Sequence, residues 1–386
     1  MRILFAGDMA FKYFDEFPGK EKACETFSET ARMFSEYDFS VLNLENVLGN
    51  TDDYEPIIKS GPNLISGDNY IEYVDALNPS AVGMANNHSL DYGDGALYHT
   101  VQLLKDRNYQ VFGVGENIEE AYKPAVFEKD GIKVAIIGVC ENEFGIAEKN
   151  SPGTAGYRLG RVSRSIADAK KKGMLPMIYF HGGNEFNPFP SPGKVELYRH
   201  FIELGAKAVI AMHTHCPQGY EMYCGCPIVY SMGNFFFYKD KNENTLPSWY
   251  YGYMTVLDIT DNEITLDVIP YQFDKYSHTP LSGEDKEMFI KYLDELSRPI
   301  QDEDKLQSLF DAWSVMWGID RYMLSVVSTE ETRKGGAEEN KATKNVFSCE
   351  AHNELLINSY KILYEESRKK AETDIEMIEY YQNIEI

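Results

Sequence analysis

The sequence predicts an α/β fold with mixed sheets and a C-terminal helical extension, and three observations lead to that prediction. Short apolar runs recur over residues 1 to about 275, and several are apolar at every position instead of alternating. Such runs are typical of strands that are buried on both faces. Stretches of helical period separate the runs, which favours parallel pairing, and after about residue 275 only helical patterns remain.

The predicted strands are short runs rich in β-branched and aromatic residues. Antiparallel additions are expected around two turns, at Lys129-Asp130-Gly131 and at Asp261-Asn262. In chain order the runs are RILFAG at 2–7, SVLNLE at 40–45, AVGMAN at 81–86, YQVFGVG at 109–115, VAIIGV at 134–139, LPMIYF at 175–180, AVIAMH at 208–213, IVYSMG at 228–233 and MTVLDIT at 254–260.

The predicted helices lie between these runs, with apolar residues three or four positions apart. They cover residues 25–37, 67–78, 95–108, 164–173 and 192–205. The first and the last two lead directly into a strand, as the helices of βαβ units do.

Residues 276–386 are predicted to form a helical appendage to a working domain of residues 1–275. Segments 283–300 and 303–327 have helical period and acidic starts, which favour a helix N-terminus. Residues 347–384 have the pattern of a long amphipathic helix. The polar, glycine-containing segment near 329–344 is predicted to be a mobile linker.

The formal net charge of −24 over 386 residues excludes nucleic acid as a general partner, because so acidic a surface repels phosphate backbones. An anionic substrate would need local positive charge, which metal ions supply. No stretch approaches the roughly 18 apolar residues of a membrane span. Gly7-Asp8 interrupts the N-terminal apolar run where a signal peptide would continue, so we expect a cytoplasmic protein whose six cysteines are reduced thiols.

Polar side chains follow the apolar runs where the predicted strands end. The carboxyl ends of neighbouring parallel strands meet at one crevice, so we expect these side chains to lie close together. Four of the eight histidines belong to this set. Its members are Asp8, Asn43, Glu45, Asn86, Asn87, His88, Asp91, His181, Glu185, His213, His215 and Asn234.

Six of these residues carry the nitrogen and oxygen ligands that suit Mn, Fe, Zn or Mg. Six ligands exceed one four-coordinate site, so they suit a pair of ions roughly 3.5–4 Å apart that share a carboxylate. The strongest signal is His213-x-His215, because residues i and i+2 of an extended backbone point to the same side. The six candidates are Asp8, Glu45, Asn87, His181, His213 and His215.

Each candidate taken alone also has a structural interpretation. Asp8 follows a glycine, as turn and N-cap residues do, and Glu45 suits a solvated strand end. Asn86 and Asn87 suit a turn, and His88 suits a cap for the segment after it. The common position at six strand ends is what favours ligands over these alternatives.

With these motifs in view, the chain resembles the capsule-synthesis CapA family, also called the poly-γ-glutamate capsule biosynthesis family, which is related to calcineurin-like metallophosphoesterases. The matching segments occur in family order over residues 1 to about 240. They are FAGDMAF, VLNLENVL, GMANNHSLDYG, HGGNEF, GAKAVIAMHTHCPQGYE and IVYSMGNFFF. The resemblance implies a four-layer αββα sandwich with a metal site at one edge.

The resemblance also implies a role for each site residue. Asp8 and His215 would bind the first metal, and Asn87, His181 and His213 the second, with Glu45 as the bridging carboxylate. His88, supported by Asp91, would be the catalytic residue that binds phosphate or acts as general acid. Substrate contact or support of the ligands is implied for Asn43, Asn86, Glu185 and Asn234.

Two positions depart from the superfamily pattern. A histidine is expected two residues after the first aspartate, where this chain has Ala10, and an aspartate is expected where it has Glu45. Both changes concern the first metal, so the number of ions, one or two, is left open.

We therefore expect a metal-dependent hydrolase that acts on a phosphoester or related anionic substrate, in capsule, polyglutamate or cell-envelope polymer metabolism. The alternative is a non-hydrolytic protein that handles or assembles a poly-γ-glutamate or polysaccharide capsule. In that case the C-terminal helices would bind a protein partner or self-associate. A basic groove at the crevice and an exposed apolar stripe within residues 345–380 would favour the alternative. A scaffold that has lost catalysis is a third interpretation, suggested by Ala10.

Overall fold

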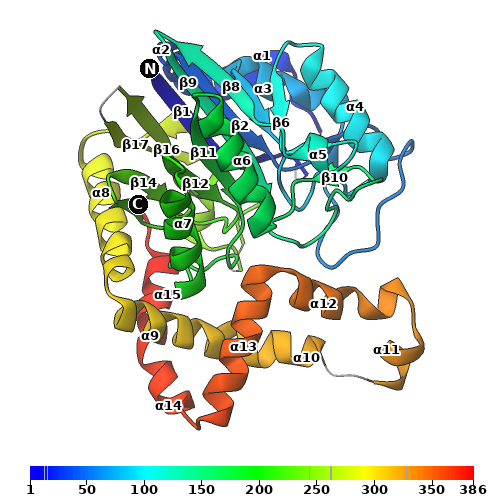
Figure 1. Ribbon diagram of the computed structural model, residues 1–386, viewed down its shortest axis with the longest axis vertical. Coiled ribbons are helices and arrows are strands. Elements are labelled where there is room, and N and C mark those ends of the chain that lie inside the picture. The colour runs from blue at the N-terminus through cyan, green and yellow to red at the C-terminus, as the bar shows by residue number, and fades with distance from the viewer. Residues whose placement is uncertain (13, 15, 243, 261–262, 327–328) are drawn as a thin grey trace.

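Two mixed β-sheets stacked face to face form the centre of the molecule (Figure 1). The computed structural model describes residues 1–12, 14, 16–242, 244–260, 263–326 and 329–386. The predicted turn at residues 261–262 lies outside this range. The turn at Asp130-Gly131 is confirmed, since it joins two antiparallel strands and both residues have positive φ.

The first sheet has the strand order β18-β17-β16-β1-β2-β5-β6, and β15 also pairs with β1. Its parallel part is β1, β2, β5, β6 and β15, and β16 to β18 add an antiparallel edge. The strands are β1 Arg2–Ala10, β2 Phe39–Leu44, β5 Ala81–Gly83, β6 Gln110–Phe112, β15 Asn234–Phe237, β16 Tyr251–Ile259, β17 Ile264–Phe273 and β18 His278–Pro280.

The second sheet has the order β13-β14-β12-β11-β9-β8, with parallel pairing inside and an antiparallel strand at each edge. Its strands are β8 Ala125–Lys129, β9 Ile132–Cys140, β11 Leu175–His181, β12 Ala208–Met212, β13 Tyr220–Tyr223 and β14 Cys226–Val229. Two small ribbons pair β3 Val47–Leu48 with β4 Ile65–Ser66, and β7 Val114–Gly115 with β10 Gly153–Thr154.

Strand β1 shows how the sequence builds the layers, because alternate side chains enter different cores. Ile3 and Phe5 enter the core between the two sheets, while Leu4 and Ala6 enter the core on the other face. Tyr179 of β11 donates a hydrogen bond of 2.6 Å to the carbonyl of Ala6, which ties the two sheets together.

Helices cover the outer face of each sheet, so the predicted four-layer αββα sandwich is confirmed. Helices α1 Lys20–Thr26, α2 Ser28–Glu36, α3 Ile71–Leu77 and α4 Gly93–Lys105 share a core with the first sheet. Helices α5 Ile118–Ala121, α6 Leu159–Lys171 and α7 Pro192–Leu204 share one with the second. The short turns η1 Asp68–Tyr70 and η2 Pro247–Tyr250 complete this part.

The appendage is helical from residue 283 onward, as predicted. The predicted boundary at residue 275 is too early, because β18 still pairs with the first sheet. Phe289, Trp313, Leu355 and Ile378 belong to the same buried cluster as the core between the sheets. The elements are α8 Gly283–Ser297, η3 Arg298–Gln301, α9 Glu303–Trp313, the π-helical η4 Ser314–Tyr322, α10 Met323–Ser325, α11 Glu330–Lys334, α12 Ala337–Ser348, α13 Glu350–Tyr364, α14 Arg368–Ala371, η5 Glu372–Asp374 and α15 Ile375–Asn383. In Figure 1, α8 lies beside the sandwich, while α9 to α14 lie below it.

The segment near 329–344 is not the polar linker that we predicted, because α11 and most of α12 lie in it. Composition misled the prediction, since a helix can be polar for most of its length and be held by a few contacts. Here Glu339 caps the start of α12 by accepting from the Gly336 backbone, and Asn345 and Val346 are buried near its end.

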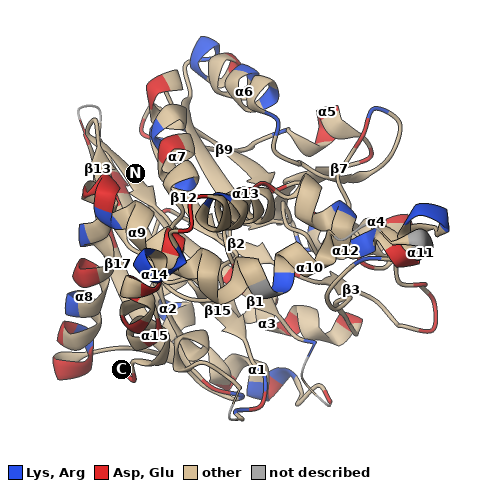
Figure 2. Ribbon diagram, turned by 90° about the horizontal axis from the view of Figure 1, so that it is seen from below, with Lys and Arg blue, Asp and Glu red and all other residues tan. Residues whose placement is uncertain are grey.

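Helix α13 is hydrogen-bonded to the loops that follow the carboxyl ends of strands in the second sheet. The backbone N–H of Ala351 donates to Glu141, which follows β9, at 2.9 Å. Glu350 accepts from both the backbone and the side chain of Asn142, and Glu354 accepts from Ser191 and Gly193 at the start of α7. Viewed from below, α13 crosses in front of the strands while charged residues mark outer helices such as α6 and α8 (Figure 2). Among the helices of the described residues, none has both the length and the apolar character needed to cross a membrane.

Candidate metal centre

Asp8 lies at the centre of the candidate site because of the register of the first sheet. It is paired with Asn43 of β2 on one side and with Asn234 of β15 on the other. Its side chain is fully buried and accepts hydrogen bonds from Asn43 Nδ2 at 2.7 Å and from the His213 backbone N–H at 2.9 Å. The last bond spans the two sheets, so Asp8 holds the His213 loop against β1.

Glu45 follows β2 and is the second buried carboxyl group of the site. Its backbone N–H donates to Met9, which fixes the loop beside β1. The side chain is fully buried, and neither carboxylate oxygen has a hydrogen-bond partner among the described residues. Its close polar contact is with His181 Nε2, and a buried carboxylate without a hydrogen bond is costly, so this arrangement favours a cation or a proton beside Glu45.

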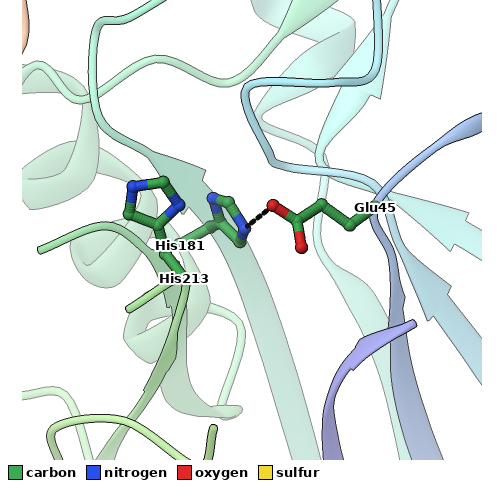
Figure 3. A group of neighbouring side chains, drawn as sticks. All are labelled: Glu45, His181 and His213. Atoms are coloured by element: carbon green, nitrogen blue, oxygen red, sulfur yellow. Dashed lines mark ion pairs between the residues drawn. The ribbon is translucent and has the colours of Figure 1, made fainter. Parts of the chain in front are cut away.

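Three histidines face these two carboxylates, and Figure 3 shows two of them, His181 and His213, beside Glu45. His181, the last residue of β11, brings its Nε2 to 3.2 Å from Glu45 Oε1 and to 3.6 Å from Asp8 Oδ1. The ring of His213 lies 4.5 Å from the ring of His181 and 6.0 Å from that of His215. Within the described part of the chain, His181 Nε2 and His213 Nδ1 are buried and make no hydrogen bond.

The backbone around His213 and His215 differs from the prediction. We assumed extended backbone, but β12 ends at Met212, and the two histidines have positive φ values of 104° and 56°. Such values are strained for residues with a side chain, and strain of this kind is concentrated at functional sites. The turn, and not strand alternation, directs both rings into the site.

Two groups of ligand atoms emerge from this geometry, and Glu45 belongs to both. Glu45, His181 and His213 form one group, and Asp8, Glu45 and His215 form the other. In each group, the ligand atoms lie within 4.8 Å of one another. The donor set of carboxylate oxygen and imidazole nitrogen fits Mn, Fe, Zn or Mg. The buried atoms of Glu45, His181 and His213 that make no hydrogen bond in the described structure are available to coordinate such ions.

The pKa values of the buried carboxyl groups and imidazoles also favour the binding of cations. Burial, followed by the nearby charge of Glu45, raises the pKa of Asp8 to about 7. Burial likewise raises the pKa of Glu45 well above its usual value. Burial lowers the pKa of His181, His213 and His215, so these rings are neutral and able to bind a metal at neutral pH.

Amide side chains lie next to the candidate ligands. Asn234 Oδ1 lies 2.8 Å from Nδ1 of His215, which assigns the proton to Nδ1 and leaves Nε2 free. Asn86 donates to the side chain of Asn43 at 3.2 Å, and Asn43 in turn donates to Asp8. Asn234 and Asn43 therefore contact candidate ligands and Asn86 contacts Asn43, and the supporting role of these three amides stays a prediction.

His88 belongs to a buried triad beside this centre. Asp91 Oδ2 lies 2.6 Å from Nδ1 of His88, and Lys59 Nζ contacts Asp91 Oδ1 at 2.5 Å and His88 Nδ1 at 3.1 Å. Burial and the charge of Lys59 lower the pKa of His88. Lys59 was not found from the sequence, because it lies in the loop at 51–64 away from any predicted strand end.

Asn87 is placed differently from the other predicted ligands. Its Nδ2 donates to Glu143 Oε2 at 2.5 Å, while its buried Oδ1 accepts no hydrogen bond from the residues the structure describes. Glu143 and Glu141 were also missed, although a signal existed. Both follow the apolar run that became β9, so the rule that selected the other strand ends would have selected them too.

A cavity of about 250 Å³ opens beside His88 and Asn87, and the appendage forms one side of it. The sandwich supplies Lys59, Glu143 and Glu185, while the appendage supplies Tyr322, Asn345 and His352. His352 Nε2 lies 3.7 Å from Glu143 Oε1, and its buried Nδ1 is without a hydrogen-bond partner in the described structure. Glu143, Cys349 and His352 form a third cluster of ligand type, which no sequence motif indicated.

Comparison with known proteins places these residues in a family context. Residues 2–239 match the family described as bacterial capsule synthesis protein PGA_cap. The PGA biosynthesis protein CapA of Bacillus subtilis (strain 168) is 26% identical over 237 residues, which cover 60% of this chain and 62% of that protein.

Two further relatives show a similar level of identity. The capsule biosynthesis protein CapA of Bacillus anthracis is 27% identical over 214 residues, covering 53% of this chain and 50% of its own. A probable polyglutamine synthesis accessory protein of Mycobacterium tuberculosis is 26% identical over 241 residues, covering 58% and 63%. The match therefore spans only half to somewhat under two thirds of each relative, and the appendage lies outside residues 2–239.

Proposed function

The chain belongs to the bacterial capsule synthesis protein PGA_cap family, and on that premise we propose that it is a metal-dependent hydrolase of a phosphoester or related anionic substrate. The observation that carries the proposal is the shared position of Glu45 in two ligand groups. A carboxylate common to two adjacent sites is the arrangement by which two-metal hydrolases hold their ions. The substrate belongs to capsule, polyglutamate or cell-envelope polymer metabolism, which the relatives' names support.

The two groups described above would hold the ions. Asp8 and His215 would hold the first, His181 and His213 the second, and Glu45 is common to both groups. Asn87 would join the second group through its Oδ1, which makes no hydrogen bond in the described structure. When bound, divalent ions polarise a phosphoryl oxygen and make water nucleophilic near neutral pH.

His88 protonates the leaving group or stabilises its negative charge. Asp91 accepts from Nδ1, which leaves Nε2 as the ring nitrogen available to substrate. Because the pKa of His88 is lowered in the free protein, its ring is neutral at pH 7 until an anion enters the cavity and stabilises the imidazolium. Lys59 adds a buried positive charge beside the same position.

The test is metal analysis of the purified protein together with hydrolysis assays on phosphomonoesters and phosphodiesters with added Mn²⁺. We expect bound metal and Mn²⁺-dependent turnover, both abolished in the Glu45→Ala and His213→Ala variants. The matched control is His200→Ala, since His200 is exposed on α7 and remote from the ligand groups. Absence of both metal and turnover under every ion tested would refute the proposal.

A second candidate function is assembly through the appendage without hydrolysis, and one observation favours it. Ile357, Tyr360, Leu363 and Tyr364 recur at helical spacing on α13 and are exposed, with Tyr364 at 91%. An apolar stripe of this kind on a helix is typical of a surface that binds another protein. The relatives that are named as biosynthesis or accessory proteins are compatible with such a role.

In this second candidate function, the apolar stripe on α13 binds a second copy of the chain. Light scattering over a range of concentrations should show self-association that Ile357→Ser with Tyr364→Ser removes. The control is Tyr98→Ser, which changes an exposed tyrosine on α4. A monomer at every concentration would argue against assembly through this face and leave the hydrolase proposal unaffected.

A further inference from the structure

We propose that a second cavity, beside His215, is a subsite for an anionic group of the substrate that is remote from the reacting bond. This inference rests on the proposed function, because it treats the metal centre as the place of reaction. The cavity measures about 260 Å³, and its principal lining residues are Phe186, His215, Lys239, Trp249, Trp317 and Arg321. It shares no lining residue with the cavity beside His88.

Two cations in this cavity are held by aromatic rings instead of carboxylates. Lys239 Nζ lies 3.5 Å from the ring centroid of Trp249, and the guanidinium carbon of Arg321 lies 3.7 Å from that of Trp317. Neither makes an ion pair with any carboxylate that the structure describes, although the charge of Glu185 acts on Lys239. In a chain with a net charge of −24, two cations that line one cavity without an ion pair to the described residues favour an anionic ligand there.

The aromatic wall connects this cavity to the metal centre. Phe186 stacks on Trp249 and on Trp317, with ring centroids 6.1 and 5.9 Å apart, respectively. The backbone N–H of Phe186 donates to the carbonyl of Thr214, which lies between the two ligand histidines. The ring of Trp249 is 4.8 Å from that of His215. A substrate whose reacting group reaches the ions therefore extends along Trp249 towards Lys239.

The chemistry of the wall defines the class of ligand. Cations above indole rings offer N–H donors to a carboxylate or phosphate, and the ring faces accept a flat or apolar segment next to it. Burial lowers the pKa of Lys239 to about 8, so this half-buried side chain remains mainly protonated at pH 7. An anion binds more strongly in such surroundings than at an exposed lysine.

The appendage contributes one of the two cations and part of the aromatic wall of this subsite. Trp317 and Arg321 come from η4, and Gln382 of α15 donates to the backbone carbonyl of Phe186 at 2.8 Å. These residues lie beyond the part of the chain that matches the family, residues 2–239. The subsite therefore gives this chain a substrate preference that the family segment by itself does not determine.

The experiment compares probes that differ only at the remote position. Phenylphosphonate, 4-carboxyphenylphosphonate and 1,4-phenylenediphosphonate, which have no ester bond to hydrolyse, are titrated into the full chain loaded with Mn²⁺, and their affinities are measured by calorimetry. We expect the two probes with a second anion to bind about tenfold more tightly, since a charge-assisted hydrogen bond contributes that much. The order of these two probes distinguishes a carboxylate subsite from a phosphate subsite.

The tighter binding of the probes with a second anion should disappear in Arg321→Gln and in Lys239→Gln, while the affinity for phenylphosphonate stays the same. The matched control is Lys241→Gln, because Lys241 lies 4.7 Å over the ring of Tyr250 but does not line the cavity. Trp317→Phe, which keeps an aromatic ring, serves as a second variant if the Arg321 variant is unstable, and it should weaken the binding of the probes with a second anion.

Equal affinities for all three probes in the wild-type protein would overturn the inference, and so would an equal loss for all three in the Lys239 or Arg321 variants. Binding is measured without turnover, so a protein that discriminates the probes but hydrolyses no phosphoester contradicts only the proposed function. A protein that hydrolyses phenyl phosphate and does not discriminate the probes contradicts only the subsite.

Discussion

Replacing Glu45 with glutamine should have opposite effects on the metal-free and the metal-loaded protein. The substitution keeps the shape of the side chain and removes the charge. In the metal-free protein, the carboxyl group of wild-type Glu45 is fully buried and has no hydrogen-bond partner in the described structure, so ionising it above its usual pKa is costly. Relieving an uncompensated group of this kind contributes about 2 kcal/mol to the free energy of unfolding.

The sign follows from the raised pKa of Glu45. A carboxyl group whose pKa is higher in the folded state contributes stability that is present below its unfolded pKa and is lost as the pH rises. The variant should therefore be more stable than the wild type at pH 8, and the difference should shrink towards pH 4.5. For 386 residues the unfolding entropy is about 0.8 kcal/mol per kelvin, so ~2 kcal/mol raises the Tm by about 2.5 °C.

Metal should reverse this order. Saturation at about 100 times the Kd stabilises the wild type by about 2.7 kcal/mol, or about 3 °C, whereas the variant lacks the ligand common to both groups and should gain almost nothing. Thermal unfolding at pH 8 with and without Mn²⁺ measures both effects. The matched control is Glu221→Gln, because Glu221 is buried but accepts from Arg199, Tyr230 and Gln301. The control should lose stability and retain the metal-induced rise.

Two results would refute this reasoning. A metal-induced rise in the Glu45 variant equal to that of the wild type would show that Glu45 is not a ligand. A metal-free variant that is less stable than the wild type at pH 8 would show that the carboxylate is compensated in the native protein.

Three further predictions concern the centre and the appendage. The pKa of Asp8 is about 7, so a proton competes with metal below that pH. Calorimetry should show the affinity for Mn²⁺ falling about tenfold per pH unit from about pH 7 to 5, and a pH-independent affinity would contradict the assignment of Asp8 as a ligand. Asn in place of His88 should lower kcat by about 100-fold or more while metal content is unchanged, and an unaltered kcat would remove His88 from the reaction. Glu354→Ala deletes the bonds to Ser191 and Gly193, so urea unfolding should show a loss of about 1–3 kcal/mol, whereas no loss would mean that this contact does not hold α13.

Most of the fold was predictable because its signals are local. Strand burial on both faces follows from a few consecutive residues, as in the alternation of Ile3, Leu4 and Phe5 between two cores. The αββα layering followed from the family resemblance and is confirmed by the structure. The linker prediction for 329–344 was wrong, because composition does not report the contacts that hold α12, such as the buried side chains of Asn345 and Val346.

The site was predictable to the extent that its residues share a position at strand ends. Asp8, Glu45, His181, His213 and His215 were found by that rule, and Glu143 would have been found by the same rule. Lys59, Lys239 and His352 could not be found, because a loop or an appendage carries them to the crevice through contacts distant in sequence. Their placement depends on packing, which no local pattern encodes.

The sequence by itself determined which strands are buried and which polar residues stand at their carboxyl ends, because the period of the side chains and the chain direction settle both. Only the tertiary structure decided which of those residues belong to each ligand group. The register of β1 between β2 and β15, and the positive φ of His213 and His215, bring Glu45 into two groups at once. The tertiary structure also set α13 and η4 against the crevice. The physical reason is that a ligand group and a cavity wall are made by elements from different sheets and helices, whose distances are fixed by the packing of the whole core.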